Sequence, residues 1–147
     1  MTVVHIVIGC AALGLNLVAF LWGAWAWARR QPSLWFWRVL RAGQGAIVLE
    51  AILGGVLLAI GKKVSNLHLI YGLLPLVVSF MAEQLRISAA QMILDKRGFE
   101  SAQEVGELPA DEQRGIVISV VRREIGVMAL SALVTAALVA RAATVVH

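Results

Sequence analysis

Long apolar runs separated by short polar segments dominate the pattern of this chain. Four runs approach or exceed the length of about 20 mostly apolar residues that a membrane-spanning helix needs. They cover approximately residues 3–28, 41–61, 67–87 and 125–146. The pattern therefore predicts an all-α membrane protein, in which residues 1–147 form a single bundle of four transmembrane helices.

Helical periodicity continues beyond the third run and begins again before the fourth. Residues 88–124 are therefore expected to form a cytoplasmic loop that includes helical extensions of both spans. Gly98 is the predicted end of the third helix, because glycine readily adopts the left-handed backbone found there. The fourth helix is expected to begin around 109–111, with acidic side chains in its first turn, where the helix dipole favours them.

Basic residues predict the orientation of the bundle. Arg29, Arg30, Arg38 and Arg41 lie in and beside the segment after the first run, which has no acidic residue. Under the positive-inside rule this segment is cytoplasmic. The protein is therefore expected in the cytoplasmic membrane, with both termini on its outer side. The first run is longer than the apolar part of a cleavable signal peptide, and no basic region precedes it, so a cleavable signal peptide is not expected.

All five tryptophans flank the same segment, which is typical of an aromatic belt at a membrane interface. They are Trp22, Trp25, Trp27, Trp35 and Trp37.

Composition supports the membrane class and narrows the chemistry. Hydrophobic residues make up 60% of the chain, whereas soluble proteins are nearer half apolar. The net charge of +4 does not indicate nucleic-acid binding, because the basic residues gather at helix ends and face lipid headgroups. The single cysteine excludes an internal disulfide. The absence of a phosphate-binding loop or an HExxH sequence argues against an NTPase or a zinc hydrolase.

Small and polar residues recur every three or four positions along each run, which places them on one helix face. Membrane helices pack through such faces, so we expect them to converge inside the bundle. In the first run they are His5, Gly9, Ala12, Asn16, Ala19 and Gly23.

Glu50 lies in the middle of the second run, far from Arg41 and Lys62 at its ends. A charged side chain at that depth costs at least about 2.5–3.5 kcal/mol. Two interpretations remain open: a functional group that exchanges protons, or a neutral carboxyl hydrogen-bonded across helices. Asn16, at a similar depth in the first run, is the expected partner and completes a polar core.

The three histidines, His5, His68 and His147, are all expected at the outer end of the bundle. His5 and His68 lie on inward faces of different helices, where they can ligate one haem iron. Gly9 and Gly72, one turn further in, are expected to leave space for a flat ring. The same histidines can instead hold zinc or copper, or be interfacial residues without a ligand.

Cations near the same end suit the propionates of a haem. Arg141 lies close to the outer end of the fourth run, and Lys62 and Lys63 form the turn before the third. A carboxylate paired with a cation is favoured in a dry site, so Arg141 is a candidate haem-binding residue.

The segment VLEAILGGVLLAIGKKVSNLHL resembles the second and third helices of the four-helix units in haem A synthases. In that family a glutamine precedes a Leu-Gly-Gly run, and the next helix opens with a haem-ligating histidine. The matching positions here are Glu50, Leu53, Gly54, Gly55 and His68, while His5 matches a histidine at the outer end of the first helix of the unit.

The resemblance implies haem binding in a four-helix bundle and departs from the family in several ways. Glutamic acid replaces the glutamine, the Glu-x-x-His-Arg signature is missing around His5, and no outer cysteine pair is present. The chain also corresponds to only one of the two units. These departures argue against haem A synthesis.

The sequence therefore favours a small integral membrane protein with b-type haem, for electron transfer or haem handling, with quinone as a candidate electron partner. One alternative is a non-enzymatic accessory or assembly subunit of a larger membrane complex, such as a respiratory one, or a homo-oligomer. Another is a proton-coupled transport component that uses Glu50. A redox carrier or accessory subunit is expected rather than a stand-alone enzyme.

Overall fold

The computed structural model describes residues 2–145, which form α-helices and no strands. The helices are α1 Thr2–Arg29, α2 Leu34–Ala59, α3 Asn66–Lys96, α4 Ala102–Gly106 and α5 Ala110–Thr144. All except the short α4 are long and apolar enough to cross a membrane. The predicted fold class, an all-α membrane protein with four spanning helices, is confirmed. His147 lies outside the described residues.

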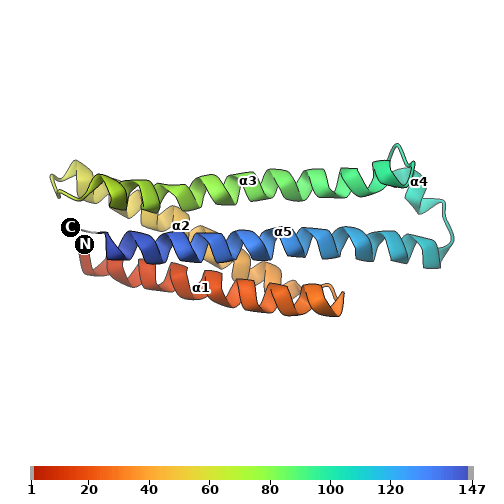
Figure 1. Cartoon of the computed structure of the whole chain (residues 1–147), viewed down its shortest axis with the longest axis horizontal. Helices are drawn as coiled ribbons and strands as arrows, with labels where there is room; N and C mark the ends of the chain where they lie inside the picture. The colour runs from red at the N-terminus through yellow and green to blue at the C-terminus, as the bar shows by residue number, and fades with distance from the viewer. Residues whose placement is uncertain (1, 146–147) are drawn as a thin grey trace.

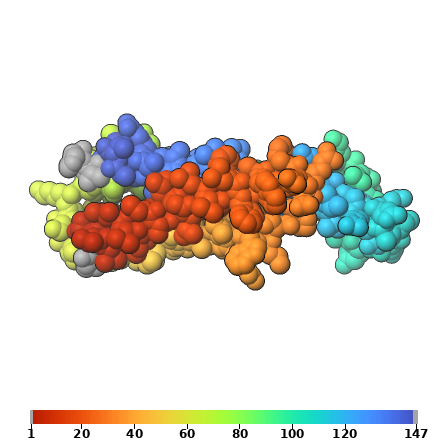
Figure 2. Space-filling model, turned by 90° about the horizontal axis from the view of Figure 1, so that it is seen from below, coloured from red at the N-terminus to blue at the C-terminus, as the bar shows by residue number. Residues whose placement is uncertain are grey.

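The four long helices run antiparallel in two hairpins, α1–α2 and α3–α5 (Figure 1). The start of α1, the end of α5 and the α2–α3 turn lie at the same end of the bundle, which we call the terminal end. At the opposite loop end, α3 and α5 continue past the α1–α2 turn and carry α4. The space-filling view shows this green and cyan extension projecting beyond the orange α1–α2 turn (Figure 2).

The helices pack unequally around the bundle. Helix α5 packs extensively on α1 and α3, and α1 packs equally closely on α2, whereas α2 and α3 contact each other much less. The α2–α3 seam is thus the most open of these faces. The core cluster combines small residues with a few large ones: Ala19, Ala26, Phe36, Leu40, Ala82, Ile125, Met128, Ala129 and Ala132.

The α1–α2 hairpin follows one register in which a glycine on one helix faces a larger side chain on the other. A Cβ atom on any of these glycines would lie 2.5 to 3.5 Å from the facing side chain. The pairs, from the loop end to the terminal end, are Gly23 with Phe36, Gly43 with Asn16, Gly9 with Glu50 and Gly54 with His5. The register therefore determines which polar groups of the two helices meet.

Local capping residues determine where the helices begin. The Ser33 hydroxyl accepts a hydrogen bond from Phe36 N at 3.3 Å, satisfying one of the free amides at a helix start. As a result α2 begins at Leu34, well before the apolar run expected from about residue 41. Helix α3 begins in the same way after Ser65, whose hydroxyl accepts from His68 N at 3.2 Å.

The ends of α3 and α5 near the loop end agree with the sequence prediction. Helix α3 stops at Lys96, and Gly98 follows in the left-handed region with φ of +80°. Phe99 N donates to Leu94 O at 3.1 Å, which closes the last turn as in a Schellman motif. Helix α5 begins after Pro109. Helix α4 was not predicted and lies within the expected polar loop.

Candidate functional site

His5 and Glu50 meet at the terminal end, between α1 and α2. Nδ1 of His5 lies 3.1 Å from Oε1 of Glu50, and their side chains are 17% and 20% exposed. The distance is that of an ion pair, but the angles do not suit a hydrogen bond. Nδ1 of His5 and Oε2 of Glu50 are therefore buried atoms without a hydrogen-bond partner among residues 2–145.

His68 joins this pair from α3. Its ring centre lies 6.1 Å from that of His5, with an angle of 60° between the ring planes. Nδ1 of His68 lies 2.9 Å from the carbonyl oxygen of Ala142 on α5. The turn before α3 is also fixed to α5, because the Ser65 hydroxyl donates to the Val145 carbonyl. All four long helices thus contribute to this cluster.

Two glycines allow these polar groups to lie against the α1 and α2 backbones. A Cβ on Gly9 would lie 2.9 Å from Oε1 of Glu50, and one on Gly54 would lie 3.5 Å from Cε1 of His5. The expectation that Gly9 leaves room for a flat ring is wrong, because the Glu50 carboxylate occupies that space. Gly72 fits the expectation, since no atom lies within 4 Å of a Cβ placed there.

Asn16 does not bond to Glu50. Its Nδ2 donates to the carbonyl of Ala12, one turn earlier on the same helix, at 2.8 Å. The side chain is 1% exposed and lies against Gly43. Seven residues, or about 10 Å of helix, separate Asn16 from the Gly9 position that faces Glu50. The sequence-based pairing of Asn16 with Glu50 is therefore wrong, and Asn16 is a packing residue with a locally bonded amide.

Arg141 lies at the terminal end but not against the histidines. Its side chain is exposed, its guanidinium lies 5.9 Å from the centre of the Tyr71 ring, and Nη1 donates to the Thr144 hydroxyl at 3.3 Å. Lys62 and Lys63 are exposed in the α2–α3 turn. These cations lie at the same end of the bundle as the histidine cluster and form no ion pair with Glu50 among the described residues.

Glu83 is a polar residue that the sequence did not single out. It accepts hydrogen bonds from Arg41, from Gln44 at 3.1 Å and from Arg86 at 3.0 Å. Arg86 also pairs with Glu124 on α5 at 3.6 Å. This network joins α2, α3 and α5 on the side of the bundle where α2 and α3 otherwise contact little. The sequence signal for this network was Glu83 inside an apolar run, with Arg86 three residues later.

The donor set suits a haem better than an isolated zinc or copper ion. Among residues 2–145, no group of three or more His, Cys, Asp or Glu side chains is placed to hold a metal. Zinc sites use three or four protein ligands, whereas a haem iron takes only its axial ligands from the protein. The two imidazoles of His5 and His68 are sufficient for that role.

Comparison with protein-family models, with curated proteins and with solved structures finds no match to this chain. The functional argument therefore rests on the chain's own residues and their geometry.

Proposed function

We propose that this membrane protein binds a b-type haem at the terminal end, with His5 on α1 and His68 on α3 as axial ligands, and serves in electron transfer or haem handling. One observation carries the proposal. Each imidazole turns Nδ1 toward an oxygen atom, the Glu50 carboxylate for His5 and the Ala142 carbonyl for His68. Metal-ligating histidines almost always orient their second nitrogen in this way.

The spacing of the two rings supports the same assignment. With Nδ1 facing an oxygen acceptor, Nε2 of each ring is the nitrogen available to a metal. The ring centres are 6.1 Å apart, so the two imidazoles are direct neighbours, as two ligands of one cofactor would be. Helices α2 and α3 contact each other little, and no atom lies within 4 Å of a Cβ placed at Gly72, four residues after His68 on α3.

The protein's own groups would hold and tune the cofactor. A bound haem supplies one-electron chemistry. With haem bound, Glu50 would orient the His5 ring and make its free nitrogen a stronger ligand, as the Ala142 carbonyl would for His68. Arg141, Lys62 and Lys63 are the cations at this end that would pair with propionates.

Titration of the purified protein with haem tests this function. We expect saturable binding of one haem per chain, with a Soret band that shifts on reduction. His147→Ala, at the chain end, should bind haem like the wild type. If the wild type gives no Soret band above that of free haem in the same detergent, the haem function is wrong. The accessory-subunit function would then be preferred.

Glu50→Leu is expected to weaken haem binding by about 10–100-fold, the usual effect of losing the group that orients a ligating histidine. Glu50→Gln should lose much less, because its amide oxygen can take the place of Oε1, which lies 3.1 Å from Nδ1 of His5. The measurement is the haem dissociation constant. Glu112→Leu, which removes an exposed carboxylate from the first turn of α5, is the matched control. Equal constants for Glu50→Leu and Glu112→Leu would show that Glu50 does not support His5.

A further inference from the structure

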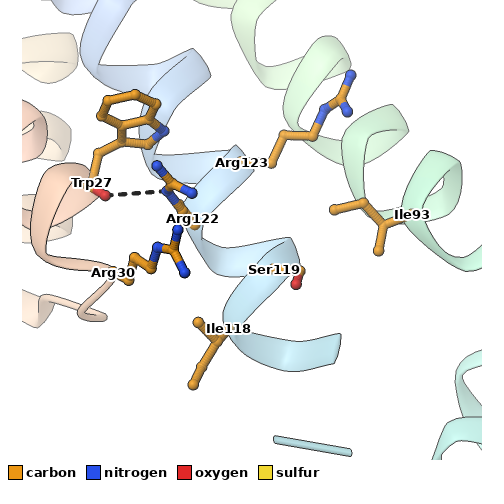
Figure 3. A pocket seen from close by; sticks show the side chains of 7 residues that line it. All are labelled: Trp27, Arg30, Ile93, Ile118, Ser119, Arg122 and Arg123. Atoms are coloured by element: carbon orange, nitrogen blue, oxygen red, sulfur yellow. Dashed lines mark hydrogen bonds between the residues drawn. The ribbon is translucent and has the colours of Figure 1, made fainter. Parts of the chain in front are cut away.

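A hollow of about 440 Å³ opens at the loop end, where α3 and α5 continue past the end of α1. It lies far along the bundle from the histidine cluster and takes no part in the proposed haem site. Residues of α1, α3 and α5, together with Arg30 just after α1, form its walls (Figure 3). The lining residues are Trp27, Arg30, Ile93, Ile118, Ser119, Arg122 and Arg123, and we call the hollow the arginine pocket.

The arginine pocket carries three positive charges and no acidic lining residue. The ion pairs within residues 2–145 use His5, Arg41 and Arg86, and none uses Arg30, Arg122 or Arg123. Arg30 and Arg122 extend into the same space in front of α5, while Arg123 reaches toward α3 (Figure 3). Like charges gathered without a carboxylate attract an anion.

Arg122 is held in position while most of its guanidinium stays available. Its Nε donates to the carbonyl of Trp27 at 3.3 Å, near the C-terminal end of α1, and the same carbonyl accepts from Arg30 N at 3.3 Å. The guanidinium also lies 4.7 Å from the centre of the Trp27 ring. The terminal nitrogens of Arg122 can therefore bond to a ligand from a fixed geometry, which suits the bidentate binding of phosphate by arginine.

Arg30 adopts a backbone conformation that glycine would adopt more easily. It follows the last residue of α1 with φ of +54°, in the left-handed region that disfavours a side chain. Gln31 N donates to Ala26 O at 3.1 Å across this residue, so the position is the usual glycine of a helix end. Local backbone strain of this kind tends to gather at functional sites.

An apolar crevice adjoins the arginine pocket. A second hollow, of about 70 Å³, shares Arg30, Ile118 and Arg122 with it. The other residues of the crevice are Gln31, Pro32, Val117 and Val121. A free inorganic ion has no use for an apolar wall, whereas a lipid carries an anionic headgroup beside apolar chains. The tryptophans near the end of α1 are also typical of a membrane interface.

We propose that the arginine pocket binds the phosphate group of an anionic phospholipid. Basic pockets between membrane helices at the cytoplasmic side are the usual sites for anionic headgroups. The lipid would lie where α3 and α5 extend beyond the end of α1, and would contact all three helices. This inference does not depend on haem binding.

Native mass spectrometry of the full chain in detergent tests the proposal, with phosphatidylglycerol and phosphatidylcholine as separate probes. We expect phosphatidylglycerol to bind the wild type roughly tenfold more tightly or better. Arg30→Gln and Arg122→Gln should each weaken it by roughly fivefold, the effect of about one cation near an anionic headgroup. Arg38→Gln is the matched control, since Arg38 lies against Trp35 outside the pocket and should bind like the wild type.

Three results would overturn the proposal. One is equal affinity of the wild type for the two lipids, and another is an equal loss in the Arg38 and Arg30 variants. The third is complete displacement of phosphatidylglycerol by excess inorganic phosphate, which would make the pocket a site for the free ion. The melting temperature of each variant is measured alongside its lipid binding. If Arg122→Gln unfolds because its contact with Trp27 is lost, the exposed Arg30 decides the outcome.

Discussion

His5→Ala and His68→Ala are each expected to remove the low-spin absorption spectrum of the haem-loaded protein completely. Each variant would delete one of the two proposed ligands, and Glu50, which lies 3.1 Å from Nδ1 of His5, would orient His5 rather than replace it. No third histidine lies in the cluster among the described residues. The measurement is the optical spectrum, oxidised and reduced, of each variant purified after expression with added haem.

The control for this pair is the folded state of each variant. Helical circular dichroism close to that of the wild type would show that the loss of the spectrum reflects a lost ligand. An unchanged low-spin spectrum in both variants would contradict ligation by His5 and His68. An unchanged spectrum in one variant alone would exclude that histidine as a ligand.

Gly23→Ala is expected to lower the free energy of unfolding by about 1–3 kcal/mol, the usual cost of an overpacked core. A Cβ at this position would lie 2.5 Å from the Phe36 ring and 2.7 Å from the Ala129 Cβ. Phe36 is fully buried and Ala129 nearly so, so relief requires α1 to move away from α2 or α5. The measurement is the unfolding midpoint of the protein in detergent.

Gly14→Ala on the same helix is the matched control. No atom lies within 4 Å of a Cβ at Gly14, and alanine is favoured over glycine in a helix by about 1 kcal/mol. The Gly14 variant should therefore equal or exceed the wild type in stability. Equal destabilisation of both variants would show that the close packing of α1 at Gly23 is absent.

The architecture follows from the sequence because apolar length is a strong signal in a membrane protein. The end of α3 was also predictable, since Gly98 supplies the backbone conformation that the helix end needs. The start of α2 was not predictable from hydropathy. Arg38 and Arg41 delay the start of the apolar run, whereas the helix itself begins after Ser33, whose hydroxyl caps it. Capping and burial are different physical effects, so the helix begins before the apolar run.

The histidine cluster was partly predictable. His5 and His68 were expected at one end of the bundle, and their rings lie 6.1 Å apart. The partner of Glu50 was not predictable from depth alone, because depth counted from chain positions ignores the register of the α1–α2 hairpin. In that register Glu50 faces Gly9 and lies beside His5, whereas Asn16 faces Gly43.

The Glu83 network and the arginine pocket were not predictable, because both form through contacts between residues far apart in the sequence. Arg41 and Glu83 come from different hairpins, and Trp27 meets Arg122 only because α1 packs on α5. Sequence patterns within one helix contain no information about these pairings. The orientation of the bundle in the membrane rests on the positive-inside rule and remains a prediction.

The central claim is that one haem is held by a histidine from α1 and a histidine from α3. Electron paramagnetic resonance of the oxidised, haem-loaded wild type at low temperature tests it most directly, because the spin state of the iron reports its axial ligands. We predict a low-spin signal in the wild type that is lost in both His5→Ala and His68→Ala. A high-spin signal in the wild type, or a low-spin signal that persists in both variants, would contradict the claim.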